Sequence, residues 1–576
     1  MTYMRSRQLG AFSWRTLLVI AASALSCLGE TVWDGLDVTT RPLDVEVIRT
    51  QKEGDVDIQV LRFTSEAWEG QPMRVFAMYG KPEGAGKFPG VLHIHGGGQT
   101  ASPRDVAEMV KRGYACFSFD WTGPLATRTE YTDWPKSITP HNTLQSIDKH
   151  NKLYHAVLAA RRGLTFLAAR PEVDGDRMGA YGISWGGHLM WLINGTDSRL
   201  KAAVAIYGCG GLLSEGIASA VRISAQSLPS AQVEEWARHF DPLRYGPRQH
   251  APIMHLTGSN DFFGWPTAGG EALRSCKVDT RQSYLAGVNH GVGLAAAEAA
   301  YRWLAHYLKG EPPLPASPTV EVALSADGVP EARVKLADEP NVESAWLEYS
   351  LGPSLPPGRC WRIGALEKKG DARLAAMPIL DPSQELLAIA QAKHKGGFKL
   401  SSLPVSIIPA KLGAALGTLK PSLLISDFGD GLGGWGPWVG STQLYGQRSD
   451  LALDPSGHDG RPCLKIVPLV QPFPSFVVTL WRVGDPQWNG GESAALSLWV
   501  KGAEKALSFM AVERVQQVGE REFTASAPLK PESGWQQVIV RRDQFKDKKG
   551  DPLASWRDVQ VIQISGPCAK GDAPRL

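Results

Sequence analysis

The sequence predicts an α/β fold with a mostly parallel sheet and helices on both faces, followed by two all-β units. Three observations lead to this prediction. Between residues 72 and 309, apolar strand-like runs alternate with helix-compatible segments, and such alternation favours a parallel sheet with right-handed crossovers. The Pro-rich stretch EPPLPASP at 311–318 then indicates a stiff linker. Beyond it, β-prone runs alternate with turns and no long helical pattern occurs, as is typical of β-sandwiches.

The bulk composition indicates several soluble domains. A chain of 576 residues exceeds the usual size of one domain, and 43% hydrophobic with 21% charged residues is ordinary for globular protein. The net charge of +3 gives no reason to expect nucleic acid or an anionic membrane as partner. The seven cysteines include no C-x-x-C pair, so neither a zinc knuckle nor a thioredoxin-type site is indicated.

Residues 1–29 are predicted to form an export signal. Three arginines precede the apolar run 17–25, and small residues follow it, which is the pattern of a secretory signal and is too short to span a bilayer. Because Cys27 follows the small residues, bacterial lipoprotein processing stays open beside ordinary cleavage. No later segment is apolar enough for a transmembrane span. We therefore expect an exported protein: periplasmic, extracellular or an outer-membrane lipoprotein.

The strands of the parallel sheet are expected at apolar runs such as PMRVFAMY, FPGVLHIH and YACFSFD. Near-continuous apolar runs are typical of strands that helices cover on both faces. The expected strands are 72–79, 88–95, 114–120, 202–207, 252–257 and 282–286, with another that ends at residue 183. Residues 30–72 are mixed and polar, which favours either an N-terminal extension or the first strands.

Helices are expected between these strands. One covers 102–113, where Ser102 suits the N-cap and Gly113 the end of the helix. Others follow residue 184 or cover 152–170 and 295–308. Two segments are irregular: the polar insertion 121–150, which is long enough to be functional or disordered, and 212–248, which we expect to form a cap over the sheet edge.

The pentapeptide Gly182-Ile183-Ser184-Trp185-Gly186 stands where a strand passes into a helix. In this G-x-S-x-G context the serine lies on a sharp turn that projects its hydroxyl above the sheet. Glycines are needed on both sides because neighbouring backbone comes very close. The helix that follows directs its free N–H groups and positive end at the same point. The pattern therefore predicts Ser184 as the nucleophile of a serine hydrolase.

A base and an orienting acid follow in the expected order Ser, acid, His. Asp261 comes directly after the strand PIMHLT, and His290 comes after the strand QSYLA, so both would lie at the carboxyl edge of the sheet. Asp279 is a weaker alternative for the acid. The other interpretations are a turn or capping aspartate for Asp261 and a surface-loop histidine for His290. Together with Ser184, however, the two residues predict a catalytic triad.

The run His95-Gly96-Gly97-Gly98 follows an early strand. Lipases and esterases use an HGGG-type loop there to supply an oxyanion N–H, so we expect Gly97 or Gly98 as one donor and the backbone N–H of Trp185 as the other. His93 and His95 also form an H-x-H pair on one face of the strand. No carboxylate–histidine cluster accompanies the pair, which favours a structural role for His95 over a metal site. We expect no metal and no organic cofactor.

With these motifs in place, residues 73–309 resemble α/β-hydrolases of the dienelactone hydrolase and acetylxylan esterase type, especially secreted bacterial ones. The resemblance rests on HIHGGGQTA, FDWTG, LAARRGLTFLAARPEVDGDRMGAYGISWGG, LTGSNDFF and VNHG. It implies the triad roles for Ser184, Asp261 and His290. Dienelactone hydrolases proper use cysteine as nucleophile, so Ser184 favours ester substrates. Many such esterases carry Met or Gln after the serine, and Trp185 departs from that pattern.

The resemblance further implies deacetylation of plant polysaccharide or cleavage of another small ester. Trp121 and Trp265 fall in loops near the predicted site and could stack on a sugar, although core or lid packing explains them equally well. Arg128 and His141 in the insertion could contact an acidic group, but solvation at the surface is the favoured interpretation.

The two C-terminal units resemble, more loosely, an immunoglobulin-like sandwich at 319–409 and a galactose-binding-like jelly roll at 422–567. The catalytic domain would then cover 30–310. The jelly-roll resemblance rests on ISDFGDGLGGW, DGRPCLKI, LSLWVKG and GWQQVIVRRDQF, and it implies binding to polysaccharide. A packed sandwich core is the other interpretation for the tryptophans that would form the binding platform, namely Trp435, Trp438 and Trp488.

Two other functions remain open beside the esterase. A peptidase of the prolyl-oligopeptidase clan shares the fold, the triad order and G-x-S-x-G, but usually carries a β-propeller first. The forty or so residues between the predicted signal and the first expected strand are too few for a propeller. A non-catalytic carbohydrate-binding protein on a hydrolase scaffold is the third possibility, and the complete triad argues against it.

Overall fold

The structure is a computed structural model that describes most of the chain after residue 29. The described ranges are 30–124, 130–212, 229–352, 356–429, 431–437, 449–468, 475–488, 490–502, 505–513, 521–531 and 534–567. The predicted export signal, Cys27, Arg128 and Trp438 lie outside them. Across these ranges, no helix has both the length and the apolar character that a membrane span requires.

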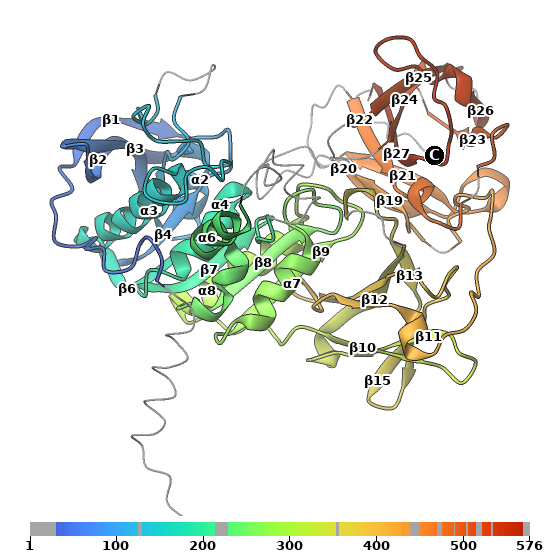
Figure 1. The fold of residues 1–576 in the computed structure, drawn as a ribbon, viewed down its shortest axis with the longest axis horizontal. Coiled ribbons are helices and arrows are strands. Elements are labelled where there is room, and N and C mark those ends of the chain that lie inside the picture. Colours follow the sequence, from blue (N-terminus) through green and yellow to red (C-terminus); the bar gives the residue numbers. More distant parts are fainter. Residues whose placement is uncertain are drawn as a thin grey trace, which may run out of the picture.

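The N-terminal part of the chain forms one nine-stranded sheet (Figure 1), in the order β1-β2-β3-β5-β4-β6-β7-β8-β9. The first three strands and β5 pair antiparallel, and every pair from β5 to β9 is parallel. The strands are β1 Glu46–Glu53, β2 Val56–Trp68, β3 Gln71–Gly80, β4 Phe88–Ile94, β5 Ala115–Phe119, β6 Val173–Ile183, β7 Leu200–Ile206, β8 Ile253–Gly258 and β9 Thr280–Leu285.

Helices cover both faces of this sheet, as the strand pattern predicts. One face packs on α2 (Pro103–Lys111) and α8 (Leu294–Lys309), whose apolar residues share one core with β5 and β7. The other face packs on α3 (Lys152–Ala169) and α4 (Trp185–Asn194). Two further helices, α6 (Ser230–Phe240) and α7 (Pro266–Ser275), contribute to the same second core. The α/β prediction is therefore confirmed.

The region that follows the Pro-rich stretch contains only antiparallel pairs and shares one apolar core. Its two sheets have the orders β10-β11-β15-β14 and β13-β12-β16-β17, with β18 also paired to β16. The strands are β10 Thr319–Leu324, β11 Pro330–Lys335, β12 Val342–Leu351, β13 Arg362–Gly364, β14 Glu367–Lys369, β15 Ala372–Ala376, β16 Leu386–His394, β17 Lys399–Ser401 and β18 Val405–Ile407. We call this part the middle β-region.

In the last part of the chain, called here the C-terminal β-region, the described strands also pair antiparallel. A five-stranded sheet, β19-β22-β27-β24-β25, accompanies the ribbons β20-β21 and β23-β26, and all of them enclose one apolar core. The strands are β19 Trp435–Pro437, β20 Ser449–Asp454, β21 Cys463–Pro468, β22 Ser475–Leu480, β23 Ala495–Val500, β24 Ala506–Glu513, β25 Arg521–Pro528, β26 Gln536–Arg541 and β27 Val559–Pro567.

The middle β-region packs against β9, the last strand of the parallel sheet. Tyr284 of β9 joins Trp361, Leu387 and Ile389 in one small buried cluster. The backbone N–H of Tyr284 donates to the hydroxyl of Ser401 at 2.8 Å, and the Gln282 amide donates to the Ser401 carbonyl at 2.7 Å. The edge strand of the catalytic sheet is therefore covered by β17.

Candidate active site

Ser184 lies on a sharp turn between β6 and α4, where G-x-S-x-G predicts it. Its backbone has φ 58° and ψ −121°, a strained conformation that non-glycine residues adopt mainly at functional turns. Both flanking glycines are required sterically. A Cβ on Gly182 would lie 2.0 Å from the Gly186 carbonyl oxygen, and one on Gly186 would lie 2.1 Å from the Ile94 carbonyl oxygen.

The structure brings the three predicted triad residues together. His290 Nε2 lies 2.7 Å from Ser184 Oγ, and His290 Nδ1 lies 3.0 Å from each carboxylate oxygen of Asp261. Asp261 is fully buried and Ser184 is 8% exposed. A nucleophile within reach of a base, itself oriented by a carboxylate, is the arrangement that acyl transfer by serine requires.

The Asp261 carboxylate is fixed by its own loop. Oδ1 accepts hydrogen bonds from the backbone N–H groups of Phe263 at 2.7 Å and Gly264 at 2.8 Å, and Oδ2 accepts one from the Thr257 hydroxyl at 3.2 Å. The alternative acid, Asp279, pairs instead with Arg281 and with the Tyr307 hydroxyl on the exposed side of the sheet. Only Asp261 of the two lies at the His290 ring.

The His290 ring is held between two aromatic rings. Its centroid lies 4.3 Å from that of Tyr207 and 4.6 Å from that of Phe262. Tyr207 follows β7 with a positive φ of 36°, so a second residue beside the site has a strained backbone. These rings restrict the imidazole to the orientation that points Nε2 at Ser184.

The glycine turn after β4 lies directly beside the nucleophile. A Cβ on Gly96 would lie 3.1 Å from the Ser184 Cβ, and one on Gly97 would lie 2.7 Å from the Trp185 ring. Gly98, by contrast, is exposed and has open space around its Cα. Of the two glycines expected as oxyanion donors, Gly97 therefore lies nearer to Trp185.

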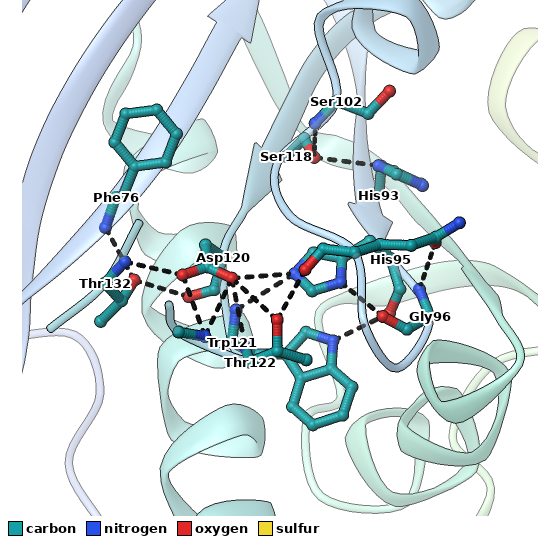
Figure 2. A network of polar contacts seen from close by, with 12 residues as sticks. Phe76, His93, His95, Gly96, Ser102, Ser118, Asp120, Trp121, Thr122 and Thr132 are labelled. Carbon is teal, nitrogen blue, oxygen red and sulfur yellow. Dashed lines mark hydrogen bonds and ion pairs between the residues drawn. The ribbon is translucent and has the colours of Figure 1, made fainter. Parts of the chain in front are cut away.

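His95 supports this turn from behind (Figure 2). Its Nδ1 lies 2.8 Å from the Gly96 carbonyl, and the Trp121 backbone N–H points at its Nε2 from 3.2 Å. The Trp121 indole N–H also donates to the His95 carbonyl at 2.8 Å. These contacts fix the ring behind the turn, so His95 acts as a structural support for the turn, as its sequence context predicts.

The carboxylate of Asp120 is a fully buried charged group beside the His95 ring. Its carboxylate lies 3.4 Å from His95 Nε2 and accepts backbone N–H groups of Thr132 at 2.7 Å and Gly123 at 3.2 Å. Burial opposes its charge, but the adjacent His95 ring and these two N–H groups prevail, so the pKa of Asp120 lies below its ordinary value. Thr132 thereby ties the insertion to the end of β5.

A second arm of the network in Figure 2 ends at His93, whose Nδ1 lies 2.9 Å from the Ser118 hydroxyl. Ser118 Oγ also accepts the backbone N–H of Ser102 at 3.1 Å. Burial lowers the pKa of His93 to about 4, so the ring is neutral. Among the described residues, no group of three or more histidines, cysteines or carboxylates could hold a metal ion.

One prediction about the insertion is wrong. His141 is not a solvated surface residue, because its ring lies 4.6 Å from that of Trp185 and 5.2 Å from that of Trp121. The Phe263 ring also packs on Trp185, at 4.9 Å between ring centroids. The sequence contains no periodic signal for this contact, since the insertion has no regular structure that would direct His141 inward.

The two tryptophans suggested as sugar contacts have different surroundings. Trp121 is fully buried, and its ring stacks on His95, which gives it the role of a wall behind the glycine turn. Trp265 is half-buried, and its indole N–H donates to the Phe262 carbonyl at 3.2 Å. It thus belongs to the loop that carries Asp261, and its contact with substrate stays a prediction.

One family model matches part of the chain. The family model described as acetyl xylan esterase (AXE1) matches residues 33–248. The match includes the glycine turn and Ser184 and ends before Asp261 and His290.

Several solved structures are similar to the chain. An acetyl xylan esterase from Paenibacillus sp. R4 is 20% identical, with a TM-score of 0.39, over 52% of this chain and 97% of that one. Acetyl xylan esterase 1 from Thermoanaerobacterium sp. JW/SL YS485 is 18% identical, with a TM-score of 0.39, over 46% and 88%. A glucuronoyl esterase from Solibacter usitatus is 14% identical, with a TM-score of 0.35, over 52% and 93%.

The family match and the candidate site lie in the same α/β domain, and the turn that carries Ser184 is part of the matched segment. The chain is therefore a serine carboxylic ester hydrolase that matches the acetyl xylan esterase family over residues 33–248.

Proposed function

We propose that Ser184, His290 and Asp261 form the catalytic triad of an esterase that removes small acyl groups, with acetyl groups on a carbohydrate as the substrate class. The observation that supports this proposal is the continuous pair of contacts from Ser184 Oγ through the His290 ring to Asp261, at 2.7 and 3.0 Å. The family described as acetyl xylan esterase supports the choice of substrate.

In this mechanism the Ser184 oxygen attacks the ester carbonyl while His290 Nε2 takes its proton. Asp261 orients the ring and stabilises the imidazolium. The tetrahedral oxyanion is held by the backbone N–H groups of Trp185 and Gly97, with Gly98 as the alternative. Collapse breaks the bond to the alcohol, which leaves with the proton from His290. Water, activated by the same histidine, then hydrolyses the acyl-enzyme and regenerates Ser184.

The packing around Trp185 supports a small acyl group. Its ring fills the space between Gly97, His141 and Phe263 and is itself only 9% exposed. A bulky side chain directly after the nucleophile limits the room beside the oxyanion donors. We therefore expect kcat/KM to fall along the series 4-nitrophenyl acetate, butyrate and octanoate. Equal kcat/KM for acetate and octanoate would contradict this part of the proposal.

The triad is tested by Ser184→Ala. We expect hydrolysis of 4-nitrophenyl acetate to fall by about 10⁴-fold or more, with an unchanged melting temperature. Ser275→Ala is a suitable control, because that hydroxyl bonds only within its own helix region, to Ala272 at 2.7 Å. Retained activity in Ser184→Ala would refute the assignment.

The same preparations separate the competing functions. A peptidase would cleave peptide 4-nitroanilides faster than acetylated xylan, whereas a non-catalytic protein would not react with a fluorophosphonate. We expect labelling of the wild-type enzyme, loss of labelling in Ser184→Ala, and preference for the acetylated polysaccharide.

We further propose that the C-terminal β-region binds polysaccharide. A cavity of about 630 Å³ there is lined by several aromatic rings and by charged side chains, among them Trp435, His458, Asp459, Arg461, Trp488 and Trp499. Trp499 is 40% exposed, and the His458 ring stacks on it at 3.7 Å. Trp499→Ala should lose retention on insoluble xylan, whereas Ser184→Ala should keep it. Unchanged retention of Trp499→Ala would refute this site.

A further inference from the structure

The loop that carries His290 is in contact with the C-terminal β-region. The indole N–H of Trp481 donates to the Gly287 carbonyl, three residues before His290. Gly436 of β19 packs on the same peptide, since a Cβ there would lie 2.0 Å from the Gly287 oxygen. Trp481 is 2% exposed. Trp481 and Gly436, both in the C-terminal β-region, therefore hold the Gly287 peptide, which leads to the proposed base His290.

The loop that carries Asp261 has an equivalent contact with the middle β-region. Asn260, directly before the acid, is fully buried. Its amide donates to the Arg359 carbonyl at 2.7 Å and to the Pro357 carbonyl at 3.3 Å, and its oxygen accepts the indole N–H of Trp361 at 3.0 Å. Both N–H groups of the Asn260 side chain, and one acceptor position of its oxygen, are thus bonded to residues of the middle β-region.

The two loops are also bonded to each other. The Ser259 hydroxyl accepts the Gly287 N–H at 2.9 Å and donates to the Asn260 oxygen at 2.8 Å. The Asn260 backbone N–H donates to the Val288 carbonyl at 3.0 Å. A continuous path of buried hydrogen bonds therefore runs from Trp481 through Gly287, Ser259 and Asn260 to Trp361.

We infer that Trp481 and Trp361 are positioning residues, through which the two β-regions set the Ser184–His290–Asp261 geometry. This inference rests on the proposed function. Neither tryptophan touches the reacting atoms; each fixes the loop that bears one member of the triad. Because the middle and C-terminal β-regions complete the loops from outside, they are parts of the active-site framework and not only appendages for binding polymer. Misplacement of a catalytic group by about 1 Å costs on the order of 100-fold in rate.

The inference is tested in the full chain with three variants. Trp481→Phe and Trp361→Phe each remove one N–H donor and keep an aromatic ring, whereas Gly436→Ala pushes on the Gly287 peptide. Two matched controls lie in the C-terminal β-region. Trp556→Phe removes an equally buried indole N–H, which donates to the Ala494 carbonyl at 2.8 Å, and Gly491→Ala adds a methyl group where nothing lies within 4 Å.

We expect kcat on 4-nitrophenyl acetate, per site titrated with fluorophosphonate, to fall about 10-fold or more in the three variants, with KM within about 2-fold. The controls should keep the wild-type kcat per titrated site even where they lower the melting temperature. A purely structural defect reduces the number of sites that the fluorophosphonate titrates, but it does not change the kcat of each remaining site. Unchanged kcat per site in Trp481→Phe and Gly436→Ala overturns the inference. Activity retained by Ser184→Ala would instead refute the triad itself, so the two failures are distinguishable.

Discussion

At the scale of single residues, the chemistry depends on a few side chains that the sequence identifies and on others that it does not. Ser184, Asp261 and His290 stand out because each follows a strand and their order along the chain is that of a hydrolase. The supporting role of Asp120 and the inward position of His141 have no such signal. Both depend on where the insertion folds back, which local sequence does not specify.

Asp120→Asn tests the charge behind the glycine turn. In the amide one carboxylate oxygen becomes an NH2 group, so either the Thr132 N–H on Oδ2 or the Thr122 N–H on Oδ1 loses its acceptor. We expect the free energy of unfolding to fall by about 2–4 kcal/mol, measured by urea denaturation.

Asp174→Asn provides the comparison at a partly exposed position. Its carboxylate pairs with Arg177 at 2.8 Å near the surface, where ion pairs contribute little. We expect a change within about 0.5 kcal/mol. Equal losses in both aspartate variants would contradict a special role for the buried carboxylate.

At the scale of elements, the parallel strands are the most predictable part of the fold. Their apolar runs are long because helices cover both faces, and the observed strands differ from the expected ones by only a few residues at their ends. The antiparallel strands β1 and β2 are the less predictable ones. Every residue of β1 but two is exposed, and an exposed edge strand lacks the apolar pattern that identifies its neighbours.

The turn between β6 and α4 can be probed with one methyl group. Gly182→Ala places a Cβ 2.0 Å from the Gly186 oxygen, a clash with backbone that no side-chain motion relieves. We expect a loss of about 3 kcal/mol or more in stability, seen as a lower melting temperature or a lower soluble yield.

Gly175→Ala, in the same strand, is the matched control. Its Cβ would meet only Ala168, at 3.8 Å, so both stability and activity should be retained. A Gly182→Ala enzyme with wild-type melting temperature would show that the turn is not as tightly packed as the contacts indicate.

At the scale of the whole molecule, the contacts between the three parts of the chain are what sequence reasoning misses. The Trp481–Gly287 bond joins residues 194 positions apart, and neither residue belongs to a motif. The sequence patterns of strands and helices indicate only which residues are buried locally. A tryptophan that packs inside its own sandwich therefore has the same sequence pattern as one that packs against another domain. The α/β sheet and the all-β character of the later parts could therefore be predicted, but not their mutual packing.

Three buried histidines predict how the stability of the whole protein depends on pH. Burial lowers the pKa of His93 to about 4 and those of His188 and His255 to about 3, whereas the unfolded chain titrates near 6.5. Below pH 6.5 the unfolded state binds more protons, so the free energy of unfolding rises with pH in this window and is lost as the pH falls towards 4. Each histidine contributes a slope of up to about 1.4 kcal/mol per pH unit.

Urea denaturation between pH 4.5 and 7.5 measures this slope. His255→Leu should reduce it by about one proton, because both ring nitrogens of His255 are buried without a hydrogen-bond partner. The variant should differ little from wild type in slope above pH 7. A slope that is the same in both proteins at pH 5 would contradict the assignment of a neutral His255.

The cover that β17 provides for β9 has one more consequence. An uncovered outer strand presents unpaired amide and carbonyl groups, on which a second molecule can add its own strand. Here Ser401 and Lys399 occupy the backbone groups of Tyr284, so the nine-stranded sheet cannot grow by that route. The middle β-region thus closes the β9 edge of the sheet, a benefit that is independent of any contact with substrate.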